Sequence, residues 1–207
     1  MYENKEIIEE IIAIEWHFFD AVHNIGGRAS CQDDWKTFHI MRSSQFSAWS
    51  RATLKSRLDD LKRAHADGRN PLTEKYGYMM CISDPAANVE LARCLPAVSD
   101  EKRALCRKIV DRLLPQNERF ARNYPHLARR ARPLRTSDER PNTATSIETY
   151  QLGELWTCSM MTLELLDKDI ENLEKSGVSY AEEVIKNSLI QRGFASLEDA
   201  ENYLAHR

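Results

Sequence analysis

The sequence predicts an all-α protein, a single-domain helical bundle of about seven to nine helices with one long loop rich in arginine and proline. First, apolar residues recur with the helical period of about 3.6 residues along most of the chain, and no alternating strand pattern persists. Second, its 207 residues include only seven glycines and seven prolines, about 7% where about 12% is typical, so helix-breaking residues are scarce. Third, all seven prolines lie between Pro71 and Pro141, which leaves both ends free to form long helices.

The N-terminal third has the pattern of three helices. The first has one apolar stripe, made of Ile8, Ile11, Ile12, Phe18, Phe19 and Val22, and runs into a loop at residues 24–30. We expect Ser30 to open the second helix, with Asp33 completing a capping pair. The apolar face of this helix consists of Trp35, Phe38, Met41, Gln45, Phe46 and Trp49. The third helix carries Leu54, Leu58 and Leu61 and is expected to stop at Gly68.

Two capping residues followed by proline mark the next starts, at Asn70-Pro71 and Asp84-Pro85. Proline suits the first position of a helix, so each pair predicts a short helix. Ser99 begins a further helix with Leu105, Ile109 and Leu113 on its apolar face.

The last part of the chain is expected to hold a long loop and three helices. Residues 125–146 lack periodicity and contain many turn formers and arginines, which predicts a long basic loop. A long helix follows from about residue 146 to 175. Residues 177–207 then form a C-terminal helical hairpin, whose helices start at the capping pairs Ser179 with Glu182 and Ser196 with Asp199.

Composition and charge exclude several classes of protein. The formal net charge is −3, with 42% apolar and 29% charged residues, as in ordinary globular domains. No apolar run approaches the roughly 20 residues that cross a bilayer, and the acidic N-terminus is unlike a secretory signal. The five cysteines form no C-x-x-C pair, which favours reduced thiols. We therefore expect one cytoplasmic domain over residues 1–207, with no membrane association.

Polar residues interrupt the apolar stripes at a few positions. Glu15 lies at the centre of the first stripe, Arg42 and Gln45 lie in line with the aromatic residues of the second helix, and Glu154 lies among apolar residues of the long helix. Four polar side chains therefore point toward one core.

Burying an ionised carboxylate costs several kcal/mol unless it is paired. Glu15 and Glu154 therefore need cations, and Arg28 and Arg42 are the available partners. One interpretation is a pocket in which a carboxylate of raised pKa acts as acid or base while arginine holds an anionic group of a substrate. The other interpretation is a structural network that fixes the register of the helices.

Cys31 is a second candidate site. A helix N-terminus and the nearby Arg28 would both stabilise a thiolate, whereas Asp33 and Asp34 oppose it. The alternative is a small residue packed under the preceding loop.

Metal and nucleic-acid binding have weaker signals. Asp20 and His23 form a D-x-x-H motif, with His17 one turn earlier, but a carboxylate-bridged metal bundle needs a second copy. We expect neither a metal nor any other cofactor. Seven arginines lie between Arg119 and Arg140 without the interleaved aromatic residues of single-strand binders. Nucleic acid is therefore not the expected partner, and the alternative is a solvated basic loop.

Four sequence blocks resemble one known family. The block NIGGRASCQDDWKTFHIMRSSQF, the upstream IEW, and the downstream ADGRNPLTEKYGYMM and IETYQLGELWTCSMMTLELL are similar to an uncharacterised bacterial family, domain of unknown function 4125. The resemblance covers nearly the whole chain and implies a helical domain, a bacterial source and, in some relatives, a joined nucleotidyltransferase-like domain. It implies no established reaction. Its motifs include Glu15, Arg28, Cys31, Asp33, Arg42, Gln45, Tyr150 and Glu154.

The first functional hypothesis is a cofactor-independent small-molecule enzyme of lyase or group-transfer type. Its substrate would be a compact, charged metabolite such as an amino acid derivative. The catalytic candidates are Glu15, Glu154, Cys31 and Asp33. The substrate-binding candidates are Arg28, Arg42, Gln45 and Tyr150, of which Tyr150 would orient the substrate through a hydrogen bond.

The alternative hypothesis is a non-catalytic binding or regulatory module that pairs with a partner enzyme through its basic loop and acidic helices, or with a second copy of itself. The two hypotheses make different predictions about the core of the protein. An enzyme needs a polar cavity that touches Glu15, Arg42 and Glu154, whereas a module needs only direct pairing of these groups.

Overall fold

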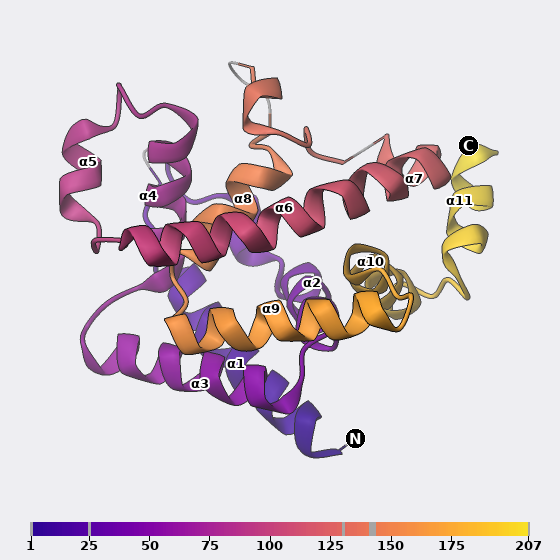
Figure 1. Ribbon diagram of the computed structural model, residues 1–207, viewed down its shortest axis with the longest axis horizontal. Helices are drawn as coiled ribbons and strands as arrows, with labels where there is room; N and C mark the ends of the chain where they lie inside the picture. The colour runs from indigo at the N-terminus through magenta and orange to yellow at the C-terminus, as the bar shows by residue number, and fades with distance from the viewer. Residues whose placement is uncertain (1, 25, 130, 141–143, 207) are drawn as a thin grey trace.

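The computed structural model describes residues 2–24, 26–129, 131–140 and 144–206, and these residues form helices joined by turns and loops (Figure 1). They contain eleven α-helices and no strand, which confirms the all-α prediction. The helices are α1 (Tyr2–Asp20), α2 (Trp35–Phe46), α3 (Arg51–Ala66), α4 (Pro71–Ser83), α5 (Val89–Cys94), α6 (Asp100–Asn123), α7 (Pro125–Ala128), α8 (Ile147–Leu155), α9 (Met160–Lys175), α10 (Tyr180–Gln191) and α11 (Leu197–Ala205). Two short 3-10 helices, η1 (Ser30–Asp33) and η2 (Thr136–Asp138), lie between them.

Most predicted helix starts are confirmed by their caps. The side chains of Asn70, Ser99, Ser179 and Ser196 each accept a hydrogen bond from a backbone N–H in the first turn of the following helix. Each bond satisfies a donor that has no partner within the helix. These polar side chains therefore set where α4, α6, α10 and α11 begin.

The predicted start of the second helix at Ser30 is wrong. The α-helix begins at Trp35, and its cap is Asp34, whose side chain accepts from the backbone N–H of Thr37 at 3.0 Å. The cause is Gln32, which is 1% exposed and donates to the backbone oxygens of Phe19 and Val22. These bonds hold η1 against the end of α1, so the chain must bend before α2 can start.

The predicted helix start at Asp84-Pro85 is also wrong. Asp84 caps the end of α4, and its side chain accepts from the backbone N–H of Ala87 in a turn. The amide of Asn88 donates to the backbone oxygens of Met80 and Asp84, at 3.1 and 2.8 Å. Asn88 thereby closes the turn, and α5 starts only after it.

The long helix expected from 146 to 175 is two helices, α8 and α9. Thr157 Oγ1 donates to the backbone oxygen of Glu154, and the backbone N–H of Ser159 donates to Asp60. Hydroxyl groups that bond to nearby backbone offer an alternative to helical hydrogen bonds, so the chain turns between Leu155 and Met160. The segment 125–146 also differs, since it contains α7 and η2; Arg130 and residues 141–143 lie outside the described residues.

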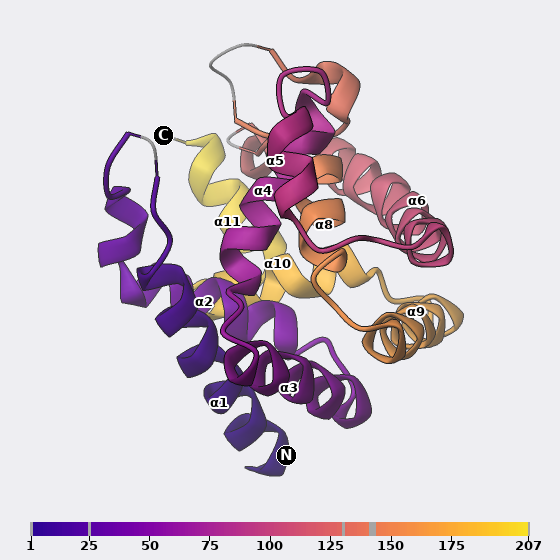
Figure 2. The same ribbon diagram turned by 90° about the vertical axis from the view of Figure 1, so that its left-hand side faces the viewer.

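Helices α4 and α8 pack closely, and they lie side by side in Figure 2. Gly153 makes this possible because a Cβ atom there would lie 2.6 Å from Met79 Cγ and 3.0 Å from the backbone oxygen of Lys75. The backbone oxygen cannot move without shifting α4. Glycine at this position therefore lets α8 come near enough for Glu154 to contact Lys75.

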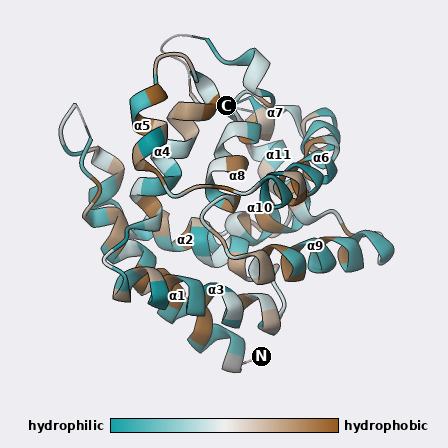
Figure 3. Cartoon of the chain, turned by 60° about the vertical axis from the view of Figure 1, so that its left-hand side comes forward, coloured by the Kyte–Doolittle hydropathy of each residue, from teal (hydrophilic) through white to brown (hydrophobic). Residues whose placement is uncertain are grey.

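Other helices pack against this pair: α1 and α5 contact α4, and α6 contacts α8. Helix α1 contacts α2, α3 and α4, while α10 contacts α2 and α6. The helices carry hydrophobic and hydrophilic residues along their length (Figure 3), and the apolar ones form one large cluster over most of the bundle. A smaller cluster joins the end of α6 to α10 and α11 through Phe120, Leu189, Leu197 and Ala200. Among the described helices, none is long and apolar enough to span a membrane.

Candidate functional site

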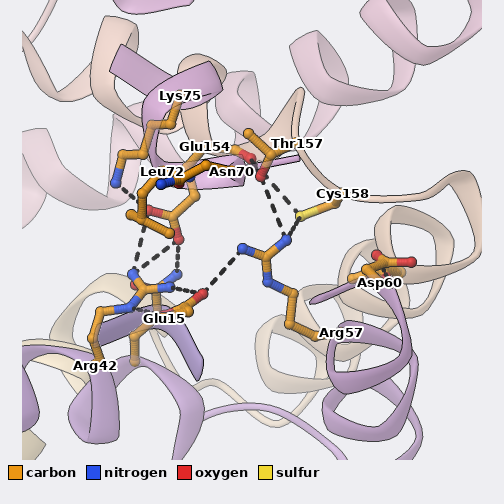
Figure 4. Close-up of polar contacts among 12 residues, drawn as sticks. Glu15, Arg42, Arg57, Asp60, Asn70, Leu72, Lys75, Glu154, Thr157 and Cys158 are labelled. Atoms are coloured by element: carbon orange, nitrogen blue, oxygen red, sulfur yellow. Dashed lines mark hydrogen bonds and ion pairs between the residues drawn. The ribbon is translucent and has the colours of Figure 1, made fainter. Parts of the chain in front are cut away.

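Five charged side chains from five helices meet in the core (Figure 4), and we call them the buried ion network. The network consists of Glu15 of α1, Arg42 of α2, Arg57 of α3, Lys75 of α4 and Glu154 of α8. None is more than 9% exposed. Glu15, Arg42 and Glu154 are thus buried and in contact, as their places on the apolar stripes indicated.

Glu15 is paired with two arginines. Arg42 donates from Nε to Glu15 Oε2 at 2.7 Å and from Nη2 to Oε1 at 3.0 Å, which is a two-point contact. Arg57 Nη2 donates to the same Oε1 at 3.0 Å. Glu15 is completely buried, so its charge depends on these guanidinium groups in place of water.

Glu154 is held by three side chains. Arg42 Nη1 donates to its two oxygens at 3.1 and 3.3 Å, and Gln45 Nε2 donates to Oε1 at 2.8 Å. Lys75 Nζ donates to Oε2 at 2.6 Å. Arg42 also donates to Gln45 Oε1 at 2.8 Å, so the Gln45 amide has a defined orientation.

The buried ion network has a surplus of positive charge. It contains three cations and two carboxylates, which leaves one charge unmatched. The sulfur of Cys158 lies 3.5 Å from Arg57 Nη1, but burial raises the pKa of Cys158, so the group stays a neutral thiol. An unmatched buried cation costs free energy, and removing either carboxylate would enlarge the surplus.

The pKa of Glu154 is lowered, whereas the catalytic interpretation of the sequence required a carboxylate of raised pKa. Burial alone would raise the pKa of Glu154, but Arg42, Lys75 and the hydrogen bonds from Lys75 and Gln45 hold it well below the ordinary value. The favourable charge interactions outweigh the loss of hydration. Glu154 is therefore an ionised hydrogen-bond acceptor and is poorly suited to donate a proton near neutral pH.

This lowered pKa predicts how stability depends on pH. A carboxylate whose pKa is lower in the folded state stabilises the fold above its unfolded value, near 4.5, and loses that contribution as the pH falls toward the folded pKa. The difference in unfolding free energy between wild type and Glu154→Gln should therefore be largest above about pH 5 and shrink as the pH falls to about 3. Urea unfolding across this range measures it, and a difference that does not change with pH would contradict the prediction.

A cavity of about 340 Å³ lies beside the buried ion network, among α2, α6, α8, α9 and α10. Its walls are mainly apolar and include Leu113, Leu166 and Val184. The polar residues that line it are Gln45, Asn117, Arg132, Tyr150, Gln151, Glu154 and Tyr180. Glu15 and Arg42 pair directly with other groups and are not among the lining residues, so the cavity reaches only the Glu154 end of the network.

Tyr150 connects the cavity to two cations. Lys75 Nζ lies 3.6 Å from the centre of the Tyr150 ring, and Arg132 Cζ lies 5.0 Å from it. Both distances are within the range of cation–π contacts. Gln151, one residue later, has a buried Oε1 that accepts no hydrogen bond from any described residue.

Three predicted site residues lie away from the buried ion network, in η1 or just before it: Arg28, Cys31 and Asp33. Arg28 donates to Asp20 at 2.5 Å and to Asp33 at 2.9 Å, and all three side chains are largely exposed. Cys31 is exposed on η1 and is not packed under the loop. Among the described contacts, none joins this group to the buried ion network, because Gln32 holds η1 at the end of α1.

The D-x-x-H motif has no metal-site geometry in the described part of the chain. Its Asp20 pairs with Arg28. No three His, Cys, Asp or Glu side chains among the described residues gather where they could hold a metal ion.

Arg57, Lys75 and Arg132 belong to the site but were not predicted. Arg57 lies on the stripe of α3 between Leu54 and Leu61, so the rule that found Glu15 could have found it. Lys75 likewise lies with the buried residues of α4. Arg132 lies in the irregular segment before α8, where the sequence has no periodicity that could place it.

The fold and the site define a class of all-α proteins in which a buried ion network adjoins a small, mainly apolar cavity. The chain belongs to the family described as Protein of unknown function (DUF4125), whose sequence model matches residues 5–202. This match confirms the resemblance seen in the sequence. No curated protein and no solved structure matches the chain.

Proposed function

We propose that this protein binds a compact metabolite with a largely apolar body in the cavity beside the buried ion network. The observation that carries the proposal is the cavity itself, about 340 Å³ in volume, with apolar walls and the fixed polar groups of Gln45 and Glu154 at one end. Small-molecule sites in proteins have this size and composition, with a few placed polar groups that set orientation.

The polar end of the cavity is rigid. Gln45 accepts from Arg42 and donates to Glu154, and Glu154 is further held by Lys75. Groups fixed by their own hydrogen bonds bind a ligand without a further loss of side-chain entropy. The buried ion network therefore supports the site by positioning Gln45 and Glu154.

Binding fits the geometry better than acid–base catalysis by the two glutamates. The pKa of Glu154 is held well below its ordinary value, chiefly by Arg42 and Lys75 against the effect of burial, and Glu15 does not line the cavity. A proton-transfer role would require access to a reacting group and a pKa nearer to neutral.

Gln151 offers a further contact for the ligand. A buried acceptor without a partner costs about 1–3 kcal/mol. Gln151 lines the cavity, and its Oε1 has no partner among the described residues. A ligand N–H or O–H group within reach of the rotating amide would remove this cost.

The neutral fluorescent dye N-phenyl-1-naphthylamine tests the proposal, since it is compact and apolar and brightens in apolar surroundings. We expect saturable binding of one dye per protein, weakened about tenfold or more in Val184→Phe, because the added ring fills the cavity. Val178→Phe is the matched control, because Val178 is 37% exposed and does not line the cavity. Absence of saturable binding to wild type, or equal binding to both variants, would contradict the proposal, provided that circular dichroism shows both to be folded.

A further inference from the structure

We propose that the cavity selects ligands with one anionic group beside the apolar body, and that Arg132 pairs with that group. This inference rests on the proposed function, because it assigns a charge to the ligand of the same cavity. Arg132 lines the cavity, and its guanidinium lies over the ring of Tyr150.

The charges around the cavity favour an anion. Among the described residues that line the cavity, Glu154 is the only carboxylate, and it is already paired with Arg42 and Lys75. Arg132 adds a further positive charge, and no described carboxylate forms an ion pair with it. The buried ion network itself carries one surplus cation. An anion entering the cavity is therefore attracted, and a cation is repelled.

Arg132 is held in position by its neighbours. Its Nη1 donates to the backbone oxygen of Thr145 at 3.1 Å, and the ring of Tyr150 lies against its guanidinium. The next residue, Pro133, accepts from the backbone N–H of Ile147 at 2.8 Å, which ties this segment to the start of α8. Arg132 is thus oriented before any ligand binds, and its remaining N–H groups can reach a carboxylate.

The chemistry of the lining residues narrows the class of ligand. Apolar walls suit an aromatic or branched aliphatic body, and the guanidinium suits a carboxylate, a sulfonate or a phosphate monoester. A free ammonium group on the ligand would face Arg132 and the surplus cation of the network. Among amino acid derivatives, the site therefore favours those whose amine is acylated or absent.

Two dyes with one ring system separate the charge from the apolar body. 1-Anilinonaphthalene-8-sulfonate carries a sulfonate that N-phenyl-1-naphthylamine lacks. We expect the sulfonate dye to bind wild type about tenfold more tightly than the neutral dye, as one charge-assisted contact allows. In Arg132→Gln this preference should disappear, because the sulfonate loses its charged partner, while saturable binding of the neutral dye shows that the cavity is still present.

Arg129→Gln is the matched control, because Arg129 is a nearby arginine that is exposed like Arg132 but does not line the cavity. It should keep the preference. Equal affinity of wild type for both dyes, a preference that survives in Arg132→Gln, or sulfonate binding that survives in Val184→Phe would overturn this inference and leave binding of the neutral dye intact. Failure of wild type to bind the neutral dye would instead contradict the proposed function.

Discussion

Replacing Glu15 by glutamine is expected to lower the free energy of unfolding by about 3–5 kcal/mol, the cost of breaking a buried ion pair from one side. Glu15 is the only carboxylate within ion-pairing distance of Arg57 among the described residues, and it also makes the two-point contact with Arg42. Without it, three buried cations share the single charge of Glu154. Urea unfolding of the two proteins at neutral pH measures the difference.

Glu10→Gln is the control for this prediction. Glu10 pairs with Lys62 at 2.7 Å, but both side chains are about half exposed, and exposed pairs contribute at most about 1 kcal/mol. A loss for Glu15→Gln as small as that for Glu10→Gln would show that the network does not depend on Glu15. The expected loss also means that reduced ligand binding by Glu15→Gln would report unfolding, so this variant cannot test a catalytic role.

Replacing Glu154 by glutamine is expected to cost a similar amount, about 3–5 kcal/mol at neutral pH. The change leaves Arg42, Arg57 and Lys75 with one carboxylate, Glu15. The NH2 group of the new glutamine would also face Arg42, Gln45 and Lys75, which are themselves hydrogen-bond donors at this position. Unfolding in urea, followed by circular dichroism, gives the free energy.

Removing the charge of Lys75, which pairs with Glu154, should lower the free energy of unfolding much less. Lys75→Met leaves two cations and two carboxylates, with Glu154 still bound to Arg42 and Gln45. A lost hydrogen bond to a charged group costs about 1.5–3 kcal/mol. The surplus charge disappears at the same time and offsets part of this cost, so we expect a net loss of no more than about 1.5 kcal/mol. If Lys75→Met proved as destabilising as Glu154→Gln, the surplus of positive charge would not be what governs the stability of the network.

Local sequence signals predicted the helices whose ends depend on nearby residues. The serines and the asparagine at the starts of α4, α6, α10 and α11 act within one turn, so a short segment contains the whole interaction. The starts near Ser30 and Asp84 depend instead on Gln32, which reaches α1, and on Asn88, which reaches back to α4. Such partners are found only when the chain is folded.

The buried ion network was partly predictable, because the helical period is a local signal that marks buried positions. Glu15, Arg42 and Glu154 interrupt apolar stripes, and Arg57 and Lys75 do so as well, since all five are buried on faces with the helical period. The cavity and the place of Arg132 were not predictable. The cavity depends on how side chains from five helices fit together. The place of Arg132 depends on its contact with Tyr150, and Arg132 lies in a segment without helical periodicity.

The most direct test of the proposed binding site is a crystal structure of the protein with bound 1-anilinonaphthalene-8-sulfonate. We expect the rings to lie between Leu166 and Val184, in the cavity that these residues line, with a sulfonate oxygen within about 3 Å of the Arg132 guanidinium. Density for the dye elsewhere on the molecule, with the cavity closed or occupied only by water, would contradict this expectation.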